Sequence, residues 1–156
     1  MSTSENRVEE DTLLPRDTSR SLPLSLLRAR EAVMVRFRPL LAGHDLTEQQ
    51  WRVIRVLHEA SPLDASEVAE RACVLAPSLT RIIKSLEERG IIRRERDQGD
   101  ARRALLSLNP GAVDLIRAVT PQSRAIYATI EARYGPEKIE QLIDMLNELA
   151  ATKDGA

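Results

Sequence analysis

The sequence predicts a mostly α-helical fold that carries one small β-hairpin, an α+β chain in which the hairpin follows the fourth helix. Three observations support this fold class. Apolar residues recur at three- and four-residue spacing in several segments, Pro and Gly separate these segments, and an arginine-rich stretch after Gly90 has the composition of an exposed strand. The order helix, strand, turn, strand over residues 77–108 is that of a winged helix-turn-helix.

The N-terminal part of the sequence predicts an arm followed by two helices. Residues 1–21 are rich in Ser, Thr and acidic residues and show no apolar periodicity, which is typical of a flexible arm. One helix is expected over residues 22–43, and a second runs from Thr47 to about residue 60. Thr47 and Gln50 have the spacing of a capping box, in which two side chains satisfy backbone N–H groups at the start of a helix.

A third helix is expected between Asp64 and Cys73. Asp64 and Glu67 have the spacing of an N-terminal cap, and Pro62 separates this helix from the one before it. Cys73 is the single cysteine of the chain, so it cannot form an intramolecular disulfide bond. It lies among Ala, Val and Leu residues, and we expect it to be a small buried residue at the end of this helix.

The fourth helix has an apolar face and a polar face. Pro77 suits the first turn of a helix and Gly90 suits the left-handed position after its last turn, so this helix is expected over residues 77–89. Apolar spacing assigns four residues to a core, namely Leu79, Ile82, Ile83 and Leu86. The outward face then holds Ser78, Thr80, Arg81, Lys84 and Glu88. The polar face of an amphipathic helix usually contacts only solvent, but the cationic hairpin that follows this helix favours the interpretation that the face contacts DNA.

Charge in the predicted hairpin is strongly positive. Ile91 and Ile92 begin a strand whose following residues are too charged for a buried sheet. Residues 97–100 have the composition of a turn, and a second strand covers residues 102–108. Residues 81–103 contain eight Arg or Lys against five Asp or Glu, whereas the whole chain has a net charge of −1. Phosphates attract such a concentration of charge. The candidate DNA-contacting residues are therefore Ser78, Thr80, Arg81, Lys84, Arg94, Arg96, Arg102 and Arg103.

Two further helices are expected after the hairpin. Asn109 can cap the first of them, which extends from Pro110 to Arg133, and Pro121 is expected to kink or interrupt it. A Gly-Pro pair at 135–136 then separates a last helix. Its apolar stripe consists of Ile139, Leu142, Ile143, Leu146 and Leu149.

The stripes on the first and last helices need a partner surface. A winged module of about eighty residues buries its own core and leaves little to cover these helices. We therefore expect a homodimer, with a helical dimerisation region over residues 22–45 and 110–151 and a winged helix-turn-helix domain over residues 46–109. A two-fold dimer would bind a near-palindromic duplex with half-sites roughly 34 Å apart.

These features resemble the multiple-antibiotic-resistance regulator (MarR) family. The resemblance covers about residues 22–149 and rests on LTEQQW at 46–51, LTRIIKSLEERG at 79–90 and DQGDARR at 97–103. The wing of the family usually reads Asp-x-Arg-Asp-x-Arg. Asp97, Asp100 and Arg102 match this pattern, but Gly99 replaces the arginine of the wing tip. A tip contact in the minor groove then has to come from Arg102, Arg103 or Arg96.

The resemblance implies a cytoplasmic, ligand-responsive DNA-binding regulator, with repression as the family default. The segments at 27–39 and 50–55 look most like regulators of homoprotocatechuate and related aromatic-acid breakdown. Asp97 and Asp100 are expected to orient the wing, Asp100 by a carboxylate hydrogen bond to Arg102.

Arg30 occupies an unusual position on the first helix. At 100° per residue it falls on the apolar side with Leu26, Val33, Phe37, Leu40, Leu41 and His44. A guanidinium there requires a carboxylate partner. One alternative is a structural ion pair with Glu31 or with an acidic residue of the last helix. The other is an aromatic carboxylate ligand, with Phe37 and Trp51 as apolar walls and His44 and Arg52 as polar contacts.

Other function classes have little support in the sequence. We find no Ser-His-Asp spacing, Gly-rich phosphate loop or metal-ligand motif, so no enzyme activity, cofactor or metal site is expected. No apolar run approaches the length of a membrane helix and the N-terminus does not resemble a signal peptide, which again predicts a cytoplasmic protein. Two alternatives stay open, a winged helix that binds protein and a redox-sensing regulator that acts through Cys73.

Overall fold

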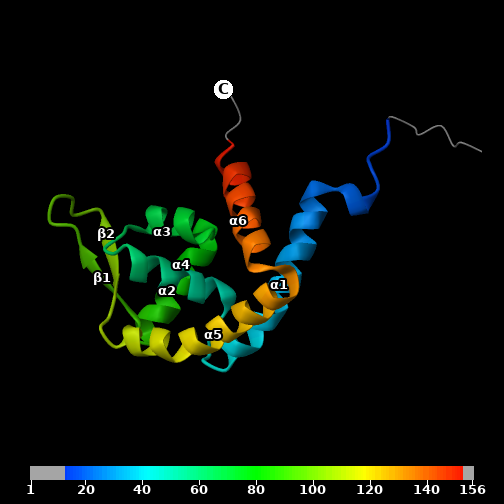
Figure 1. Ribbon diagram of the computed structural model, residues 1–156. Helices are drawn as coiled ribbons and strands as arrows, with labels where there is room; N and C mark the ends of the chain where they lie inside the picture. The colour runs from blue at the N-terminus through cyan, green and yellow to red at the C-terminus, as the bar shows by residue number, and fades with distance from the viewer. Residues whose placement is uncertain (1–12, 153–156) are drawn as a thin grey trace, which may run out of the picture. The chain divides into compact units, whose positions relative to one another are not determined.

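The computed structural model describes residues 13–152 of the 156-residue chain. Its elements, in chain order, are the 3₁₀ turn η1 (Thr18–Arg20), α1 (Leu22–Ala42), α2 (Glu48–Glu59), α3 (Ala65–Ala72), α4 (Ala76–Glu88), β1 (Ile92–Arg96), β2 (Ala104–Leu108), α5 (Ala112–Tyr134) and α6 (Pro136–Ala151) (Figure 1). The predicted fold class, mostly helical with one small β-wing, is confirmed.

The chain divides into two compact units inside α1, between Met34 and Val35. Most of the predicted arm, residues 1–12, lies outside the described residues. In the rest of that arm, the side chain of Asp17 caps η1 by accepting a hydrogen bond from the backbone N–H of Ser19 at 2.7 Å. The proposed division into a dimerisation region and a winged domain stays a prediction.

The core of the second unit is formed by the end of α1, by α2, α3 and α4, by the hairpin and by the start of α5. Its fully buried side chains are Val53, Ile54, Leu57, Val68, Leu86, Ile92, Leu106 and Val119. The helices begin where their caps predict. Thr47 and Gln50 form the capping box of α2, and the carboxylate of Asp64 accepts from the N–H of Glu67 at 2.9 Å at the start of α3.

The hairpin is antiparallel, with Ile92 opposite Leu108 and Arg96 opposite Ala104. Leu63 forms an isolated β-bridge with Leu106 that no sequence pattern indicated. Its backbone exchanges two hydrogen bonds with Leu106, at 2.7 and 3.1 Å, and so attaches β2 to the loop between α2 and α3. The base of the wing is therefore fixed to the helices.

One expectation about α5 is wrong, and of the kink or interruption expected at Pro121 only the interruption is contradicted. Asn109 does not cap this helix, which begins after Gly111 without a side-chain cap. The Asn109 amide instead donates to the carbonyl oxygens of Gly90 at 2.8 Å and Ile92 at 3.4 Å, because the packed hairpin brings these groups within its reach. Pro121 does not interrupt α5, which continues to Tyr134.

Cys73 is exposed, so the expectation of a buried thiol is wrong. It occupies the left-handed position that ends α3, with φ of 52°, and this turn directs the chain so that the next residue, Val74, enters the core instead.

Figure 1 shows α5 running past the winged-helix part of this unit and turning at its end into α6, which projects away from it. None of the residues of α6 is buried. In residues 13–152 no helix combines the length and the apolar character that crossing a membrane requires.

Candidate nucleic-acid interface

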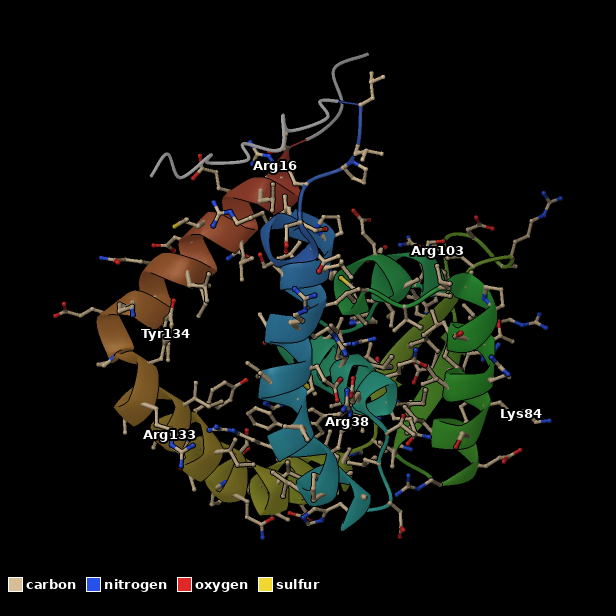
Figure 2. All side chains as sticks on the ribbon, turned by 90° about the vertical axis from the view of Figure 1, so that its right-hand side faces the viewer. Arg16, Arg38, Lys84, Arg103, Arg133 and Tyr134 are labelled. Carbon is tan, nitrogen blue, oxygen red and sulfur yellow. The ribbon has the colours of Figure 1, made fainter. Side chains whose placement is uncertain are left out.

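The outward face of α4 is held in place by its buried face. Leu79, Ile82, Ile83 and Leu86 are buried as predicted, and Thr80, Arg81 and Lys84 are exposed on the other side. Figure 2 shows Lys84 extending away from the helix. Ser78 is half-buried in the first turn. The hydroxyl of Thr80 donates to the carbonyl of Ala76 at 3.2 Å.

The C-terminal end of α4 is attached to the preceding elements. The guanidinium of Arg89 donates to the carbonyl oxygens of Asp45 at 2.6 Å and His44 at 3.3 Å, and the amide of Gln50 donates to the hydroxyl of Ser85 at 3.3 Å. Arg89 therefore attaches α4 to the loop between α1 and α2. Its charge had been counted in the cationic segment 81–103 that indicated contact with DNA.

The turn of the hairpin is shaped by two aspartates. The N–H of Asp97 donates to the carbonyl of Arg103 at 2.9 Å, and its carboxylate accepts from the N–H of Gly99 at 3.0 Å. The carboxylate of Asp100 accepts from the backbone N–H of Arg102 at 3.0 Å. The expected hydrogen bond from Asp100 is thus made to the backbone of Arg102 rather than to its guanidinium, because a short side chain reaches the nearby N–H of its own turn.

Arg103 lies at the centre of an acidic cluster. Its guanidinium contacts the carboxylates of Asp64 at 2.9 Å, Glu67 at 2.5 Å and Asp97 at 3.5 Å. The hydrogen bond from the backbone of Glu67, with Arg103 as a further cause, holds the pKa of Asp64 below its ordinary value, although some burial opposes this. Hydrogen bonding to Asp64 raises the pKa of Arg103. The guanidinium that we assigned to DNA therefore links the wing to the start of α3.

The remaining cations fall into two groups. Arg93 pairs with Glu95 at 3.2 Å, and Arg94 pairs with Glu87 at 2.6 Å on the protein surface. Among the residues that the structure describes, four cations of α4 and the wing have no carboxylate partner, namely Arg81, Lys84, Arg96 and Arg102. All four are exposed, so phosphate oxygens can approach them without displacing a protein carboxylate.

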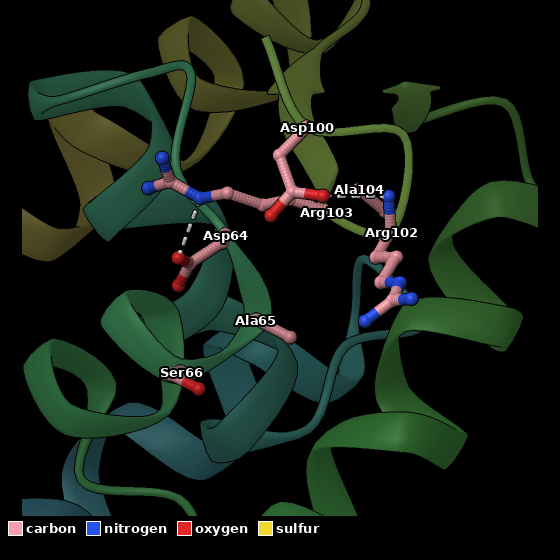
Figure 3. A pocket seen from close by; sticks show the side chains of 7 residues that line it. All are labelled: Asp64, Ala65, Ser66, Asp100, Arg102, Arg103 and Ala104. Atoms are coloured by element: carbon pink, nitrogen blue, oxygen red, sulfur yellow. Dashed lines mark hydrogen bonds and ion pairs between the residues drawn. The ribbon is translucent and has the colours of Figure 1, made fainter. Parts of the chain in front are cut away.

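A hollow of about 400 Å³ lies between the wing turn and the start of α3. It is lined by Asp64, Ala65, Ser66, Asp100, Arg102, Arg103 and Ala104. Figure 3 shows Arg103 directed toward Asp64 and Arg102 extending in the other direction from the same turn. Two adjacent arginines thus have different environments, one bound by carboxylates and one open to solvent.

The candidate ligand residues have separate environments. Phe37 is buried against Tyr127 of α5, with ring centroids 5.0 Å apart and planes inclined by 54°. Tyr127 was not among the predicted site residues, although the chain has only one Phe and two Tyr, so few rings could pair with Phe37. Trp51 packs half-buried against the core, and His44 is half-buried in the loop after α1. Arg30 belongs to the first unit and is exposed.

Arg52 makes a contact that the sequence did not indicate. Its guanidinium donates to the carbonyl of Cys73 at 3.4 Å, in the turn between α3 and α4. Within residues 13–152 its Nε is a buried nitrogen without a hydrogen-bond partner. Arg52 therefore connects α2 to the turn between α3 and α4. The structure also pairs Arg38 of α1 with Glu48 of α2, a contact that no sequence pattern indicated.

Known proteins share this arrangement of helices and wing. The model of the MarR family matches residues 46–104. The homoprotocatechuate degradative operon repressor of Escherichia coli is 41% identical over 131 residues, which cover 84% of this chain and 88% of the repressor. This chain belongs to the MarR family. A second relative, the HTH-type transcriptional regulator FarR of Neisseria gonorrhoeae, is 40% identical over 134 residues and is covered over 92% of its length, with 86% of this chain matched.

Solved structures agree with this assignment. The transcriptional regulator PA4135 has a TM-score of 0.82 and 42% identity and is covered over 98% of its chain, with 86% of this chain matched. NadR in complex with 4-hydroxyphenylacetate has a TM-score of 0.78 and 38% identity, and the match covers 90% of this chain and all of NadR. As a member of the MarR family, the protein is a ligand-responsive DNA-binding transcriptional repressor and not an enzyme.

Proposed function

We propose that this MarR-family repressor acts as a homodimer that an aromatic carboxylate releases from a near-palindromic operator. The observation that carries the DNA-binding part is the set of four exposed cations on α4 and the wing for which the described residues provide no carboxylate partner. The ligand class is supported by two relatives, the homoprotocatechuate operon repressor and NadR, which was solved with 4-hydroxyphenylacetate.

Exposed apolar surface on α6 supports the homodimer. Leu142, Ile143, Leu146 and Leu149 recur on this helix at helical spacing, and each is between 37 and 44% exposed. An apolar stripe on a helix without any buried residue is expected to pack against another apolar surface. The same stripe on a second copy of the chain is such a surface.

The DNA contacts are proposed as follows. Arg81 and Lys84 enter the major groove with Ser78 and Thr80 close to the backbone, while Arg96 and Arg102 hold phosphates. Arg102 borders the hollow beside α3, which leaves its guanidinium room to approach a phosphate. Arg94 is available once its exposed pair with Glu87 opens, since surface pairs of this kind contribute little. Asp97 and Asp100 shape the turn, and we reassign Arg103 to the same positioning role.

For the ligand we retain the contacts that the sequence indicated and add Tyr127. Within the second unit, Phe37 with Tyr127 and Trp51 are the proposed aromatic walls, and His44 and Arg52 are the polar candidates. Arg30 of the first unit stays the candidate for the carboxylate on the sequence argument alone. Release of DNA requires that the ligand binds one dimer geometry more tightly than the other, so operator and ligand must weaken each other.

Titration of a labelled operator complex tests this proposal. We expect 4-hydroxyphenylacetate or a related aryl acid to lower operator affinity and to change the fluorescence of Trp51, the single tryptophan of the chain. The matched control is the corresponding aryl amide, which lacks the carboxylate and should have little effect. The proposal fails if operator affinity and Trp51 fluorescence stay constant with every aryl acid tested.

Exposure of Cys73 favours one alternative, regulation by oxidation of this thiol. Under that alternative, hydrogen peroxide lowers operator affinity in the wild-type protein and not in Cys73→Ser. Equal affinity of the two proteins with and without peroxide eliminates it.

A further inference from the structure

The residue before the recognition helix α4 is an unusual choice for its position. Leu75 is the N-cap residue of α4, and its side chain is 79% exposed. Ala76 and Pro77, which follow it, are also exposed. These three residues form an apolar tip at the N-terminal end of the helix, while Thr80, Arg81 and Lys84 make the rest of the exposed face polar or charged.

The fold does not account for this leucine. N-cap positions favour Ser, Thr, Asp and Asn because their side chains accept a hydrogen bond from the free N–H groups of the first turn. The other two helices of the helix-turn-helix unit follow this rule with Thr47 and Asp64. Leu75 makes no such bond, and its side chain contributes nothing to the core. The N-terminus of α4 therefore has no side-chain cap, and the large apolar side chain of Leu75 is exposed to water.

The N-terminal residues of a recognition helix are the ones that reach base edges when the helix lies in the major groove. In that groove the C5-methyl group of thymine is the one apolar group that a base pair presents, and apolar side chains read it. We propose that Leu75 recognises a thymine in each half-site of the operator through contact with this methyl group. The proposal rests on the docking of the outward face of α4 in the major groove.

The surroundings of Leu75 favour DNA over an apolar protein partner. The same exposed face carries Arg81 and Lys84, for which the described residues offer no carboxylate, so the surface as a whole attracts an anion. A leucine between such a surface and a duplex meets only sugars and base edges. Arginine and lysine select guanine, and Leu75 supplies the complementary preference for thymine that they lack.

The test removes single methyl groups from the DNA. The operator is first obtained by selection of a random duplex library on the wild-type protein, and each thymine is then replaced by deoxyuridine, which lacks only the methyl group. We expect one position in each half-site at which this change weakens wild-type binding about fourfold, the effect of burying one methyl group. Leu75→Ala should bind the thymine operator more weakly and should not distinguish thymine from deoxyuridine at that position.

Two control variants separate the readout from folding and from general DNA affinity. Leu75→Ser restores an N-cap hydroxyl, so it should keep or raise the melting temperature while losing the response to deoxyuridine. Lys84→Ala lies on the same face and should bind more weakly yet keep the full response. The slope of affinity against salt should be unchanged in Leu75→Ala, because no phosphate contact is lost.

Two results overturn the inference while leaving the proposed function intact. One is a wild-type protein that binds its operator but responds to no deoxyuridine substitution. The other is a Leu75→Ala variant that retains the wild-type response at every position. If the wild-type protein enriches no sequence from the library, the proposed function itself fails, and the assignment of Leu75 falls with it.

Discussion

At the scale of single residues, the wing shows that two adjacent arginines can have different tasks. Arg103 is held by the carboxylates of Asp64, Glu67 and Asp97, whereas Arg102 has no carboxylate partner in the described part of the chain. The acidic partners of Arg103 compete with phosphate for its guanidinium, so we propose Arg102 as the DNA contact and Arg103 as the anchor of the wing.

Substitutions at Arg81 and Arg102 separate base reading from phosphate binding. We expect Arg81→Ala to weaken operator binding by about 1–3 kcal/mol with relaxed base preference, because Arg81 lies on the exposed face of α4 that we propose enters the major groove. Arg102→Ala should weaken binding to operator and random duplex alike and should reduce the salt slope by about one. Fluorescence anisotropy on both duplexes over a salt series measures these effects. Equal losses on both duplexes for both variants would contradict the division.

The acidic cluster predicts a dependence of stability on pH. Because the pKa of Asp64 is lowered in the folded protein, its contribution to stability is fully present above its unfolded pKa of about 4 and is lost as pH falls through the folded pKa. Asp64→Asn should therefore be less stable than the wild type at neutral pH, with a difference that shrinks under acid conditions.

Urea denaturation at several pH values measures this difference. Asp114→Asn is the matched control, since its carboxylate lies 3.8 Å from the guanidinium of Arg117 on the exposed surface of α5. A constant gap between Asp64→Asn and the wild type at all pH values would refute the linkage.

At the scale of elements, the recognition helix and the wing are joined by backbone geometry. Gly90 ends α4 with φ of 71°, and the amide of Asn109 donates to the carbonyl of the same glycine. The N–H of Ile91 also bonds to the carbonyl of Leu86 at 2.9 Å, which brings β1 out of the helix in a fixed direction. The direction of the hairpin relative to α4 depends on this left-handed residue.

Gly90→Ala should destabilise the protein by about 1–2 kcal/mol, the cost of a left-handed conformation for a residue with a Cβ atom. A Cβ atom at Gly90 would meet nothing within 4 Å, so the loss would come from the backbone conformation alone. Gly111→Ala is the matched control, because this site is equally open and has φ of −66°, which alanine adopts without strain. Thermal unfolding should show a lower midpoint for Gly90→Ala only. Similar midpoints for the two variants would count against the left-handed requirement.

At the scale of the whole molecule, the proposed function requires a second copy of the chain. The buried core surrounds α2, α3, α4, the hairpin and the start of α5, and α6 takes no part in it. We propose that a second copy of the chain covers the exposed stripe of α6, and such a two-fold assembly would present two recognition helices to one duplex.

Leu146→Glu should convert the dimer into a monomer and lower operator affinity at least tenfold, because it places a charge in the centre of the proposed interface. Analytical ultracentrifugation measures the assembly and anisotropy measures the affinity. Glu140→Gln, a polar change on the same helix, should leave both unchanged. A wild-type protein that sediments as a monomer would remove the basis of the two-fold model.

Local patterns of the sequence determined the helices, the caps of α2 and α3, the position of the hairpin and the outward face of α4. Thr47, Asp64, Pro77 and Gly90 act on groups within a few residues of themselves, so their effects could be deduced from spacing alone. The same holds for the four buried positions of α4, which follow from the helical period.

Only the tertiary structure decided which charged and polar groups meet. Arg103 lies 39 residues from Asp64 in the sequence, Asn109 lies 19 from Gly90, and Leu63 pairs with Leu106 across the chain. No local period encodes such pairs, because they depend on how helices and strands pack. The sequence therefore revealed that the wing is cationic, and the packing of the wing on α3 determined which of its arginines stay open to DNA.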